Sequence, residues 1–234
     1  MSLIKRLANF IKYPRIPWFM IKSARKVSFF LGKFLQYGRL NINTKNYWDN
    51  RWASGTYQKT EDERHSERRN KILEPIKPGS KVLDVGCGSG SLMHLLRDRL
   101  NCSCTGIDIS EVSINLVKGM GFEGYVTELP KLPPEILNRK FDFVIAEEVL
   151  EHLKHPDETL KALKNVLKPG GKLIATVPND CMKPGETDDH VNAFTVEPLQ
   201  TLISPYFKIE KCVTVKSWIH ESCGKRYDYR RDEQ

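Results

Sequence analysis

Along positions 81–177, short apolar runs alternate with stretches in which apolar residues recur at helical spacing. This pattern predicts strands separated by helices. Five short apolar runs have the length and composition of buried strands, and they are Lys81–Val85, Cys104–Ile107, Tyr125–Thr127, Phe141–Ala146 and Lys172–Val177. Apolar residues recur at helical spacing between them, over Ser91–Leu100, over Val112–Lys118 and from the end of the fourth run to Leu167. This order predicts an α/β fold with a doubly wound sheet and right-handed crossovers.

The segments on either side of this core carry weaker patterns. A charged stretch before the core favours a helix from Glu61 to Leu73. After the core, Val196–Ile203 predicts a further helix, and Phe207–Val215 alternates as a strand does. With 234 residues and a hydrophobic fraction of 40%, the chain is long enough for one domain plus an extension.

Charge divides the chain into an N-terminal arm, residues 1–48, and a body, residues 49–234. The arm has no acidic residue and ten basic ones, which are Lys5, Arg6, Lys12, Arg15, Lys22, Arg25, Lys26, Lys33, Arg39 and Lys45. The body therefore holds 27 basic and 29 acidic residues, and the arm alone accounts for the net charge of +8. We expect no basic nucleic-acid groove across the body.

The arm is also rich in aromatic residues and amphipathic, which predicts a helical extension. Over Ser2–Ile11 and Phe19–Phe34, apolar residues recur at helical spacing with Lys and Arg on the other side. Such a segment is typical of a helix on an anionic membrane surface. Two alternatives stay open: helices that pack on the body and close over its active site, and a transit peptide. Amphipathicity alone does not separate the three.

The cysteine pattern favours reduced thiols in a cytoplasmic compartment. The six cysteines show no CxxC spacing, and they are Cys87, Cys102, Cys104, Cys181, Cys212 and Cys223. No apolar run approaches the roughly 18 residues that a spanning helix needs, so any membrane association would be peripheral.

The run VLDVGCGSG, Val82 to Gly90, predicts a cofactor-binding turn. A buried strand leads into three glycines at alternate positions, which let a ligand approach backbone N–H groups at the start of the next helix. Asp108 ends the next strand, where a carboxylate can accept both hydroxyls of a ribose. The spacing is GxGxG rather than the GxGxxG of the dinucleotide fingerprint, which disfavours NAD.

Four motifs in this order resemble the class I S-adenosylmethionine-dependent methyltransferases, and they are VLDVGCGSG, TGIDIS, FDFVIAEEVLEHL and LKPGGKLIATVPN. The resemblance covers residues 47–215 and implies a Rossmann-like seven-stranded sheet whose last strand is antiparallel. Within that superfamily, EEVLEHL at residues 147–153 is most similar to ubiquinone-type O-methyltransferases.

The resemblance also implies a set of cofactor-binding residues. Those near the methionine part of S-adenosylmethionine would be Asp84, Gly86, Cys87, Gly88 and, at the sulfonium end, Glu147. Asp108 would hold the ribose, and the adenine would lie against Ile109, Glu128 and Leu129. Arg68 is the best match for an arginine that reaches the methionine carboxylate, with Arg69 as a competitor; a solvated helix charge is the alternative.

Glu148, Glu151 and His152 form a second candidate constellation. On an α-helix these three side chains would share one face, and His190 follows in the loop after the fifth strand. Two carboxylates and two imidazoles are a candidate site for Mg²⁺ or Mn²⁺. The sequence resembles small-RNA 2′-O-methyltransferases at this point. One alternative is that Glu151 and His152 bind no metal and only support neighbouring groups or cap the helix. The catalytic candidates are Glu148, His152 and His190.

The sequence thus predicts a methyltransferase that acts on an oxygen of a small-molecule or lipid-like acceptor. His190 or His152 would take the acceptor's proton, or a metal would lower its pKa. An RNA 2′-O-methyltransferase is the alternative, although the slightly acidic body counts against nucleic acid. A non-enzymatic cofactor-binding module is a third reading, against which the intact glycines and Asp108 argue.

Overall fold

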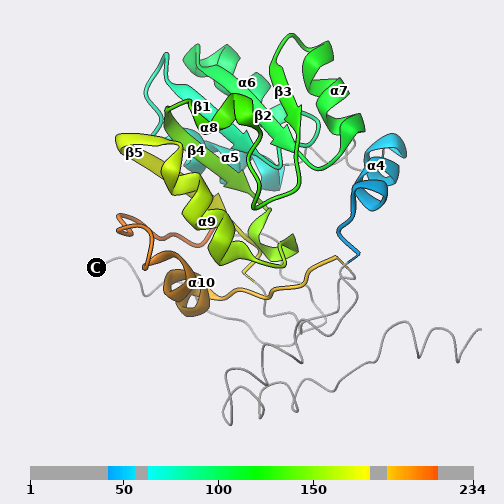
Figure 1. Cartoon of the computed structure of the whole chain (residues 1–234). Coiled ribbons are helices and arrows are strands. Elements are labelled where there is room, and N and C mark those ends of the chain that lie inside the picture. Colours follow the sequence, from blue (N-terminus) through cyan, green and yellow to red (C-terminus); the bar gives the residue numbers. More distant parts are fainter. Residues whose placement is uncertain (1–41, 56–62, 180–188, 216–234) are drawn as a thin grey trace, which may run out of the picture.

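The computed structural model describes residues 42–55, 63–179 and 189–215, and over these it shows a parallel sheet with helices on both faces (Figure 1). The strands are β1 (Lys81–Val85), β2 (Ser103–Asp108), β3 (Glu123–Val126), β4 (Phe141–Glu147) and β5 (Leu167–Thr176). Their order is β3-β2-β1-β4-β5, with every pair parallel. The predicted doubly wound α/β fold is confirmed, and the order reverses between β1 and β4.

Alternate residues of the strands bury two separate apolar clusters, one on each face of the sheet. Val82 of β1 belongs to the first cluster and Leu83 to the second. Helices α5 (Glu63–Leu73), α6 (Ser91–Leu100) and α7 (Glu111–Gly119) cover the first cluster. The second lies under α8 (Pro134–Leu137) and α9 (Pro156–Asn165). This period-2 burial fixes on which face of the sheet each strand side chain packs.

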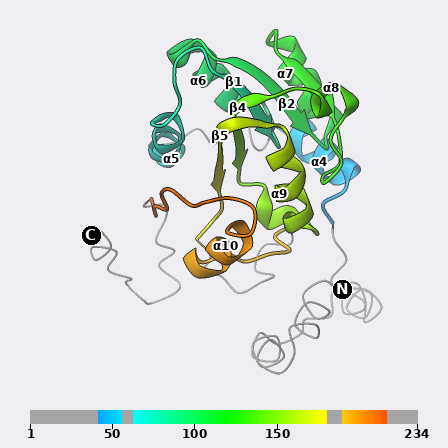
Figure 2. The same cartoon turned by 60° about the vertical axis from the view of Figure 1, so that its left-hand side comes forward.

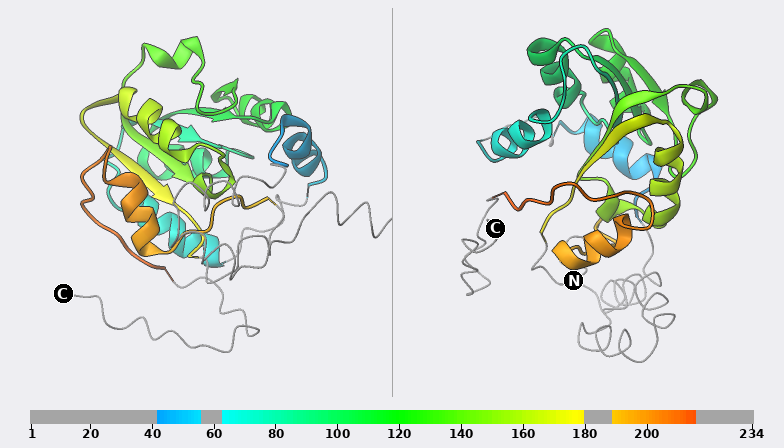
Figure 3. Two further views of the ribbon diagram at one scale, coloured as in Figure 1. Left: turned by 60° about the horizontal axis from the view of Figure 1, so that its bottom comes forward. Right: turned by 90° about the vertical axis from the view of Figure 1, so that its left-hand side faces the viewer.

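Two further helices lie at opposite sides of the sheet. Helix α4 (Lys45–Ala53) packs against α7, which itself packs on β2 and β3. Helix α4 also crosses the expected boundary between arm and body at residues 48 and 49. Helix α10 (Val196–Ile203) packs against α9 on the β5 side (Figures 2 and 3). The rest of the arm, residues 1–41, lies outside the described residues, so the structure does not test its predicted helices.

The expected seven-stranded sheet is only partly present, because the described residues form five strands. The prediction of a strand over Phe207–Val215 is wrong: this segment runs without regular structure. Phe207 packs against the apolar clusters, whereas Val213 is 51% exposed. Among the described strands β5 pairs only with β4, so the segment adds no ladder to that edge.

The continuous helix expected after β4 is also wrong. Glu148 has φ +55°, in the left-handed region, and its N–H donates to the carbonyl of Thr176 in β5 at 3.1 Å. The chain therefore leaves β4 along the sheet and then forms only a 3₁₀ turn over Leu150–His152. Helix α9 begins later, at Pro156, whose fixed φ suits a first helical position.

Candidate active site

The glycine-rich turn after β1 forms the floor of the site. Gly86 and Gly88 have φ +67° and +52°, which a residue with a side chain rarely adopts. A Cβ added at Gly86 would lie 2.6 Å from Val149, and one at Gly88 would lie 2.6 Å from the ring of Trp52. Both positions therefore need glycine for backbone conformation and for space.

Asp108 at the end of β2 is fixed by this turn. Its Oδ2 accepts the Gly88 N–H at 2.9 Å, and its Oδ1 accepts the Ser110 N–H at 2.8 Å. Burial raises the pKa of Asp108, and the hydrogen bonds from Ser110 and Gly88 oppose that rise. Asp108 is also among the residues that line the cavity.

Helix α4 forms one wall of the cavity through Trp48 and Trp52. Asp49 fastens the helix to the start of α7, where its Oδ1 accepts from the Ser110 hydroxyl at 2.7 Å and from the Val112 N–H at 3.3 Å. Ser110 in turn caps α7. The wall and the Asp108 turn are thus joined by one short hydrogen-bonded chain.

Two adjacent arginines of α5, Arg68 and Arg69, meet the carboxylates at the end of β4. Arg68 Nε lies 2.8 Å from Glu147 Oε1, and Arg69 Nε lies 3.5 Å from Glu147 Oε2. Arg68 Nη1 lies 3.5 Å from Glu148 Oε2, while Glu148 Oε1 accepts from the Thr176 hydroxyl at 3.0 Å. Burial raises the pKa of Glu148, and the Arg68 charge and the Thr176 hydrogen bond oppose the rise.

Glu151, His152 and His190 gather on the other side of the cavity, with one ligand atom of each within 4.8 Å of the others. Glu151 is 1% exposed, and the two imidazole rings lie 4.9 Å apart between centroids. Burial lowers the pKa of His152 to about 4, so its imidazole is neutral at pH 7. The prediction that Glu148, Glu151 and His152 share one face of an α-helix is wrong. Glu148 lies outside the cluster, because its own backbone is left-handed and turns the chain there.

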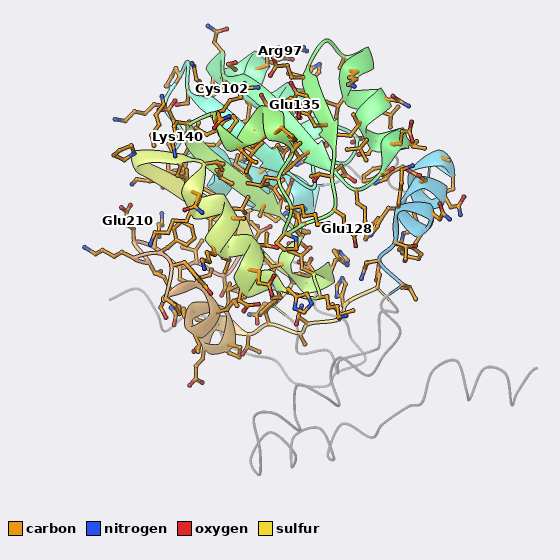
Figure 4. The ribbon with its side chains drawn as sticks, viewed as in Figure 1. Arg97, Cys102, Glu128, Glu135, Lys140 and Glu210 are labelled. Carbon is orange, nitrogen blue, oxygen red and sulfur yellow. The ribbon has the colours of Figure 1, made fainter. Side chains whose placement is uncertain are left out.

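The glycine turn, Asp108, the two tryptophans of α4, the arginine–carboxylate group and the histidine cluster all line one cavity of about 650 Å³ at the carboxyl ends of β1, β2 and β4. The predicted residues along it are Arg68, Gly86, Cys87, Gly88, Asp108, Ile109, Glu128, Leu129, Glu147, Glu148, Glu151, His152 and His190. Glu128 lies in the loop after β3, at the lower end of that strand in Figure 4. Asp84 does not line the cavity. It is 2% exposed, and burial first, then the nearby Glu147 charge, holds its pKa well above the ordinary range.

Sequence reasoning missed several residues of the site. Trp48 and Trp52 line the cavity, yet their i, i+4 spacing was the only sign that they share a helical face. Asn43 also lines it, and its side-chain amide donates to the carbonyl of Asp189 at 2.8 Å across 146 residues of sequence. No local pattern encodes a contact of that separation.

The fold and this cavity define a class of protein. A family model described as a methyltransferase domain matches residues 57–209, which is more than half of the chain. The chain therefore belongs to that family, as a class I S-adenosylmethionine-dependent methyltransferase domain, and the resemblance of the sequence motifs is confirmed.

Among the curated relatives are ubiquinone biosynthesis O-methyltransferases. The human mitochondrial ubiquinone biosynthesis O-methyltransferase is 31% identical over 188 residues, which cover 73% of this chain and 50% of the relative. The ubiquinone biosynthesis O-methyltransferase of Idiomarina loihiensis is 36% identical over 110 residues, 45% of each chain. The chain thus spans about half the length of the curated relatives it matches.

Solved structures support the same fold. The N-methyltransferase NodS from Bradyrhizobium japonicum WM9, in complex with S-adenosyl-L-homocysteine, superposes with a TM-score of 0.57 at 19% identity, covering 70% of this chain and 85% of NodS. The PH0226 protein from Pyrococcus horikoshii OT3 gives 0.55 at 25% identity, covering 67% and 88%.

Proposed function

We propose that the protein transfers the methyl group of S-adenosylmethionine to an oxygen of a small-molecule or lipid-like acceptor. One observation carries this proposal: a single cavity joins the glycine turn and Asp108 to the pair His152 and His190. Its volume of about 650 Å³ is that of an ordinary small-molecule site. The ubiquinone biosynthesis O-methyltransferases among the relatives support oxygen as the acceptor atom.

The described residues fit the cofactor. Gly86 and Gly88 leave room that a Cβ would close, and Asp108 presents a carboxylate at the cavity. We assign Asp108 to the ribose, and the side chains of Ile109, Glu128 and Leu129 to the adenine. Gly86, Cys87, Gly88 and Glu147 would border the methionine part, with Asp84 beneath them and Arg68 at the carboxylate. When bound, S-adenosylmethionine supplies a methyl group on a sulfonium, which is already a good leaving group.

The protein's own residues must then align the acceptor and remove its proton. Holding the two reactants in line can supply about 7–11 kcal/mol of the barrier. His190 would accept the proton, since a positioned base contributes about 10²–10⁴-fold. The low pKa of His152, about 4, suits an imidazole that accepts a hydrogen bond from the acceptor hydroxyl without becoming charged. Glu148, held by Arg68 and Thr176, would form part of the cavity wall beside the reacting groups.

A divalent cation is a second way to activate the acceptor. Glu151, His152 and His190 offer one carboxylate and two imidazoles within 4.8 Å of one another, a donor set that suits Mn²⁺ better than Mg²⁺. Glu148 would have to leave Arg68 to complete the predicted four-ligand site. If the cation is required, exhaustive chelation should abolish turnover and added Mn²⁺ should restore it. Full turnover after chelation would leave His190 as a plain base.

The arm would bring the cavity to a hydrophobic acceptor. Its ten basic residues and no acidic residue favour an anionic bilayer surface, as the sequence predicts. Within the described residues, no helix combines the length and apolar character needed to cross a bilayer. A surface-bound arm would therefore suit an acceptor that is partitioned into lipid.

The experiment that tests this proposal has two stages. Calorimetric titration with S-adenosylmethionine and with NAD should show binding of the first and not of the second. Incubation with methyl-labelled S-adenosylmethionine and separate phenol, lipid and RNA fractions should then place the label in a phenol or lipid fraction. Tighter binding of NAD would refute the cofactor, and label found only in RNA would refute the acceptor class.

A further inference from the structure

Asp189 links helix α4 to the imidazole of His152. It follows the segment after β5 and is only 6% exposed. Its carboxylate Oδ2 accepts from Arg51 Nη1 at 3.0 Å and from the Tyr47 hydroxyl at 3.3 Å, both on α4. Its backbone carbonyl accepts from Asn43 Nδ2 at 2.8 Å and lies 3.0 Å from His152 Nδ1. One residue thus holds α4 with its side chain and His152 with its main chain.

The bond to the Asp189 carbonyl fixes the tautomer of His152. A carbonyl oxygen can only accept, so the nitrogen that faces it, Nδ1, must carry the proton. In a neutral imidazole the other nitrogen, Nε2, then keeps a lone pair. Nε2 lies 3.9 Å from Glu151 Oε1, within the cluster that lines the cavity. The tautomer therefore leaves a hydrogen-bond acceptor on Nε2, the nitrogen nearer to Glu151, which lines the cavity with His152.

Helix α4 gives this arrangement a fixed frame. The ring of Trp48 packs edge-on against His152, with centroids 5.0 Å apart. The guanidinium of Arg51 lies over the rings of Tyr47 and Trp48, at 5.3 and 5.6 Å from their centroids. Asp49 ties the other side of the helix to Ser110. The helix therefore contacts His152 directly and also through Asp189.

We infer that Asp189 is a positioning residue for methyl transfer: anchored by Arg51 and Tyr47, its carbonyl holds His152 in the Nδ1–H tautomer with Nε2 toward the cavity. The link to methyl transfer rests on the proposed function. The tautomer itself is a property of the folded chain and can be measured without any substrate.

The test compares two variants with a matched control. Asp189→Ala removes the carboxylate, and Arg51→Met removes its charged partner while keeping the length of the side chain. Asp142→Asn is the control, since Asp142 also binds a lysine and a backbone N–H, but at the amino ends of the strands. Each protein is examined by ¹⁵N nuclear magnetic resonance of the histidines, with His152 assigned by loss of its signals in His152→Gln. Thermal melting, S-adenosylmethionine affinity and turnover with catechol complete the measurements.

We expect His152 in the wild type and in Asp142→Asn to show a protonated Nδ1 and an unprotonated Nε2. In Asp189→Ala and Arg51→Met that signature should give way to a mixture of tautomers. The kcat with catechol should fall about 10- to 100-fold, as it does when a group that orients an imidazole is lost. The dissociation constant for S-adenosylmethionine should stay within about two-fold, because the loss concerns the reacting groups.

An unchanged His152 signature in both folded variants would overturn the inference, whatever happens to turnover. Loss of S-adenosylmethionine affinity in parallel with kcat would also overturn it, because Asp189 would then act on the cofactor site. Failure of the proposed function looks different: the wild type would bind no S-adenosylmethionine. In that case a changed tautomer in both variants would still support the positioning of His152 by Asp189.

Discussion

Asp108 performs two tasks with one carboxylate. It holds the turn by accepting hydrogen bonds from the N–H groups of Gly88 and Ser110, and it lines the cavity, where we assign it to the ribose. The sequence predicted the second task from the strand end alone. The first depends on how the glycine turn folds back beneath it, which only the structure shows.

Replacing Asp108 with Ala should weaken S-adenosylmethionine binding about 10- to 100-fold, since a charged hydrogen bond contributes about 1.5–3 kcal/mol. Calorimetry measures the affinity and thermal melting the cost to the fold. Asp142→Ala is the control, because it removes a backbone-bonded carboxylate at the far end of the strands. Equal losses of affinity in both variants would show that the effect is on folding rather than on the ribose contact.

Glu148 is the residue at which backbone strain and candidate chemistry coincide. Its left-handed φ of +55° costs a residue with a Cβ about 1–2 kcal/mol relative to ordinary helical backbone. Glu148→Gly and Glu148→Ala remove the same carboxylate, but only glycine relieves the strain. In urea denaturation, the Gly variant should therefore be more stable than the Ala variant by about 1 kcal/mol. Equal stabilities would mean that the surroundings, not the residue, determine this conformation.

At the scale of elements, the sequence predicts best where a pattern is local. The runs that became β1, α6 and β4 were located within a residue of their observed ends, because each is set by a local apolar pattern, with glycines beside β1 and at the start of α6. The helix expected from the end of β4 was not found, since a ladder bond from Glu148 to β5 competes with it. The apolar and polar residues of Phe207–Val215 alternate as in a strand, but within the described residues the segment pairs with no other strand. Alternation alone does not form a strand without such a partner.

The amino ends of β1, β4 and β5 should show a pH-dependent stability. The Lys168 ammonium first, and then the Lys81 N–H, hold the pKa of Asp142 below its ordinary value of 3.8. The unfolded chain therefore takes up this proton at a higher pH than the folded one. The stabilisation is complete above the ordinary pKa and is lost as pH falls through the folded value. Denaturation midpoints of wild type and Asp142→Asn should differ at neutral pH and converge in acid; a constant difference would contradict the assignment.

At the scale of the whole molecule, the sequence predicted both sets of candidate site residues but not how they are joined. The four motifs lie within residues 82–179, whereas Asn43 and Trp48 come from the region assigned to the arm, and Trp52 lies just past its boundary. Their contacts with Gly88 and Asp189 span tens of residues to more than a hundred. Tertiary packing alone brings them together, so composition and period could not reveal them.

Deleting residues 1–40 tests the proposed membrane contact while keeping α4. Basic residues near an anionic bilayer contribute about 1 kcal/mol each, and that attraction is screened beyond about 8–10 Å in physiological salt. The intact protein should co-sediment with anionic vesicles in low salt, less in high salt, and not with neutral ones. The truncated protein should ignore both while binding S-adenosylmethionine as before. Lost cofactor affinity on truncation, with no vesicle binding by the intact chain, would instead support a packed lid.

The double attachment of α4 has a consequence for the timing of a turnover. Asp49 fastens this helix to the Asp108 side of the cavity, and Tyr47 and Arg51 fasten it to Asp189 on the histidine side. A movement of α4 that admits or releases a cofactor must break contacts on both sides. Entry and exit would then coincide with a disordered His152, and enclosure with an ordered one. An arrangement of this kind would make the protein competent only while its reactants are enclosed, and the departure of the products would then require both attachments of α4 to break.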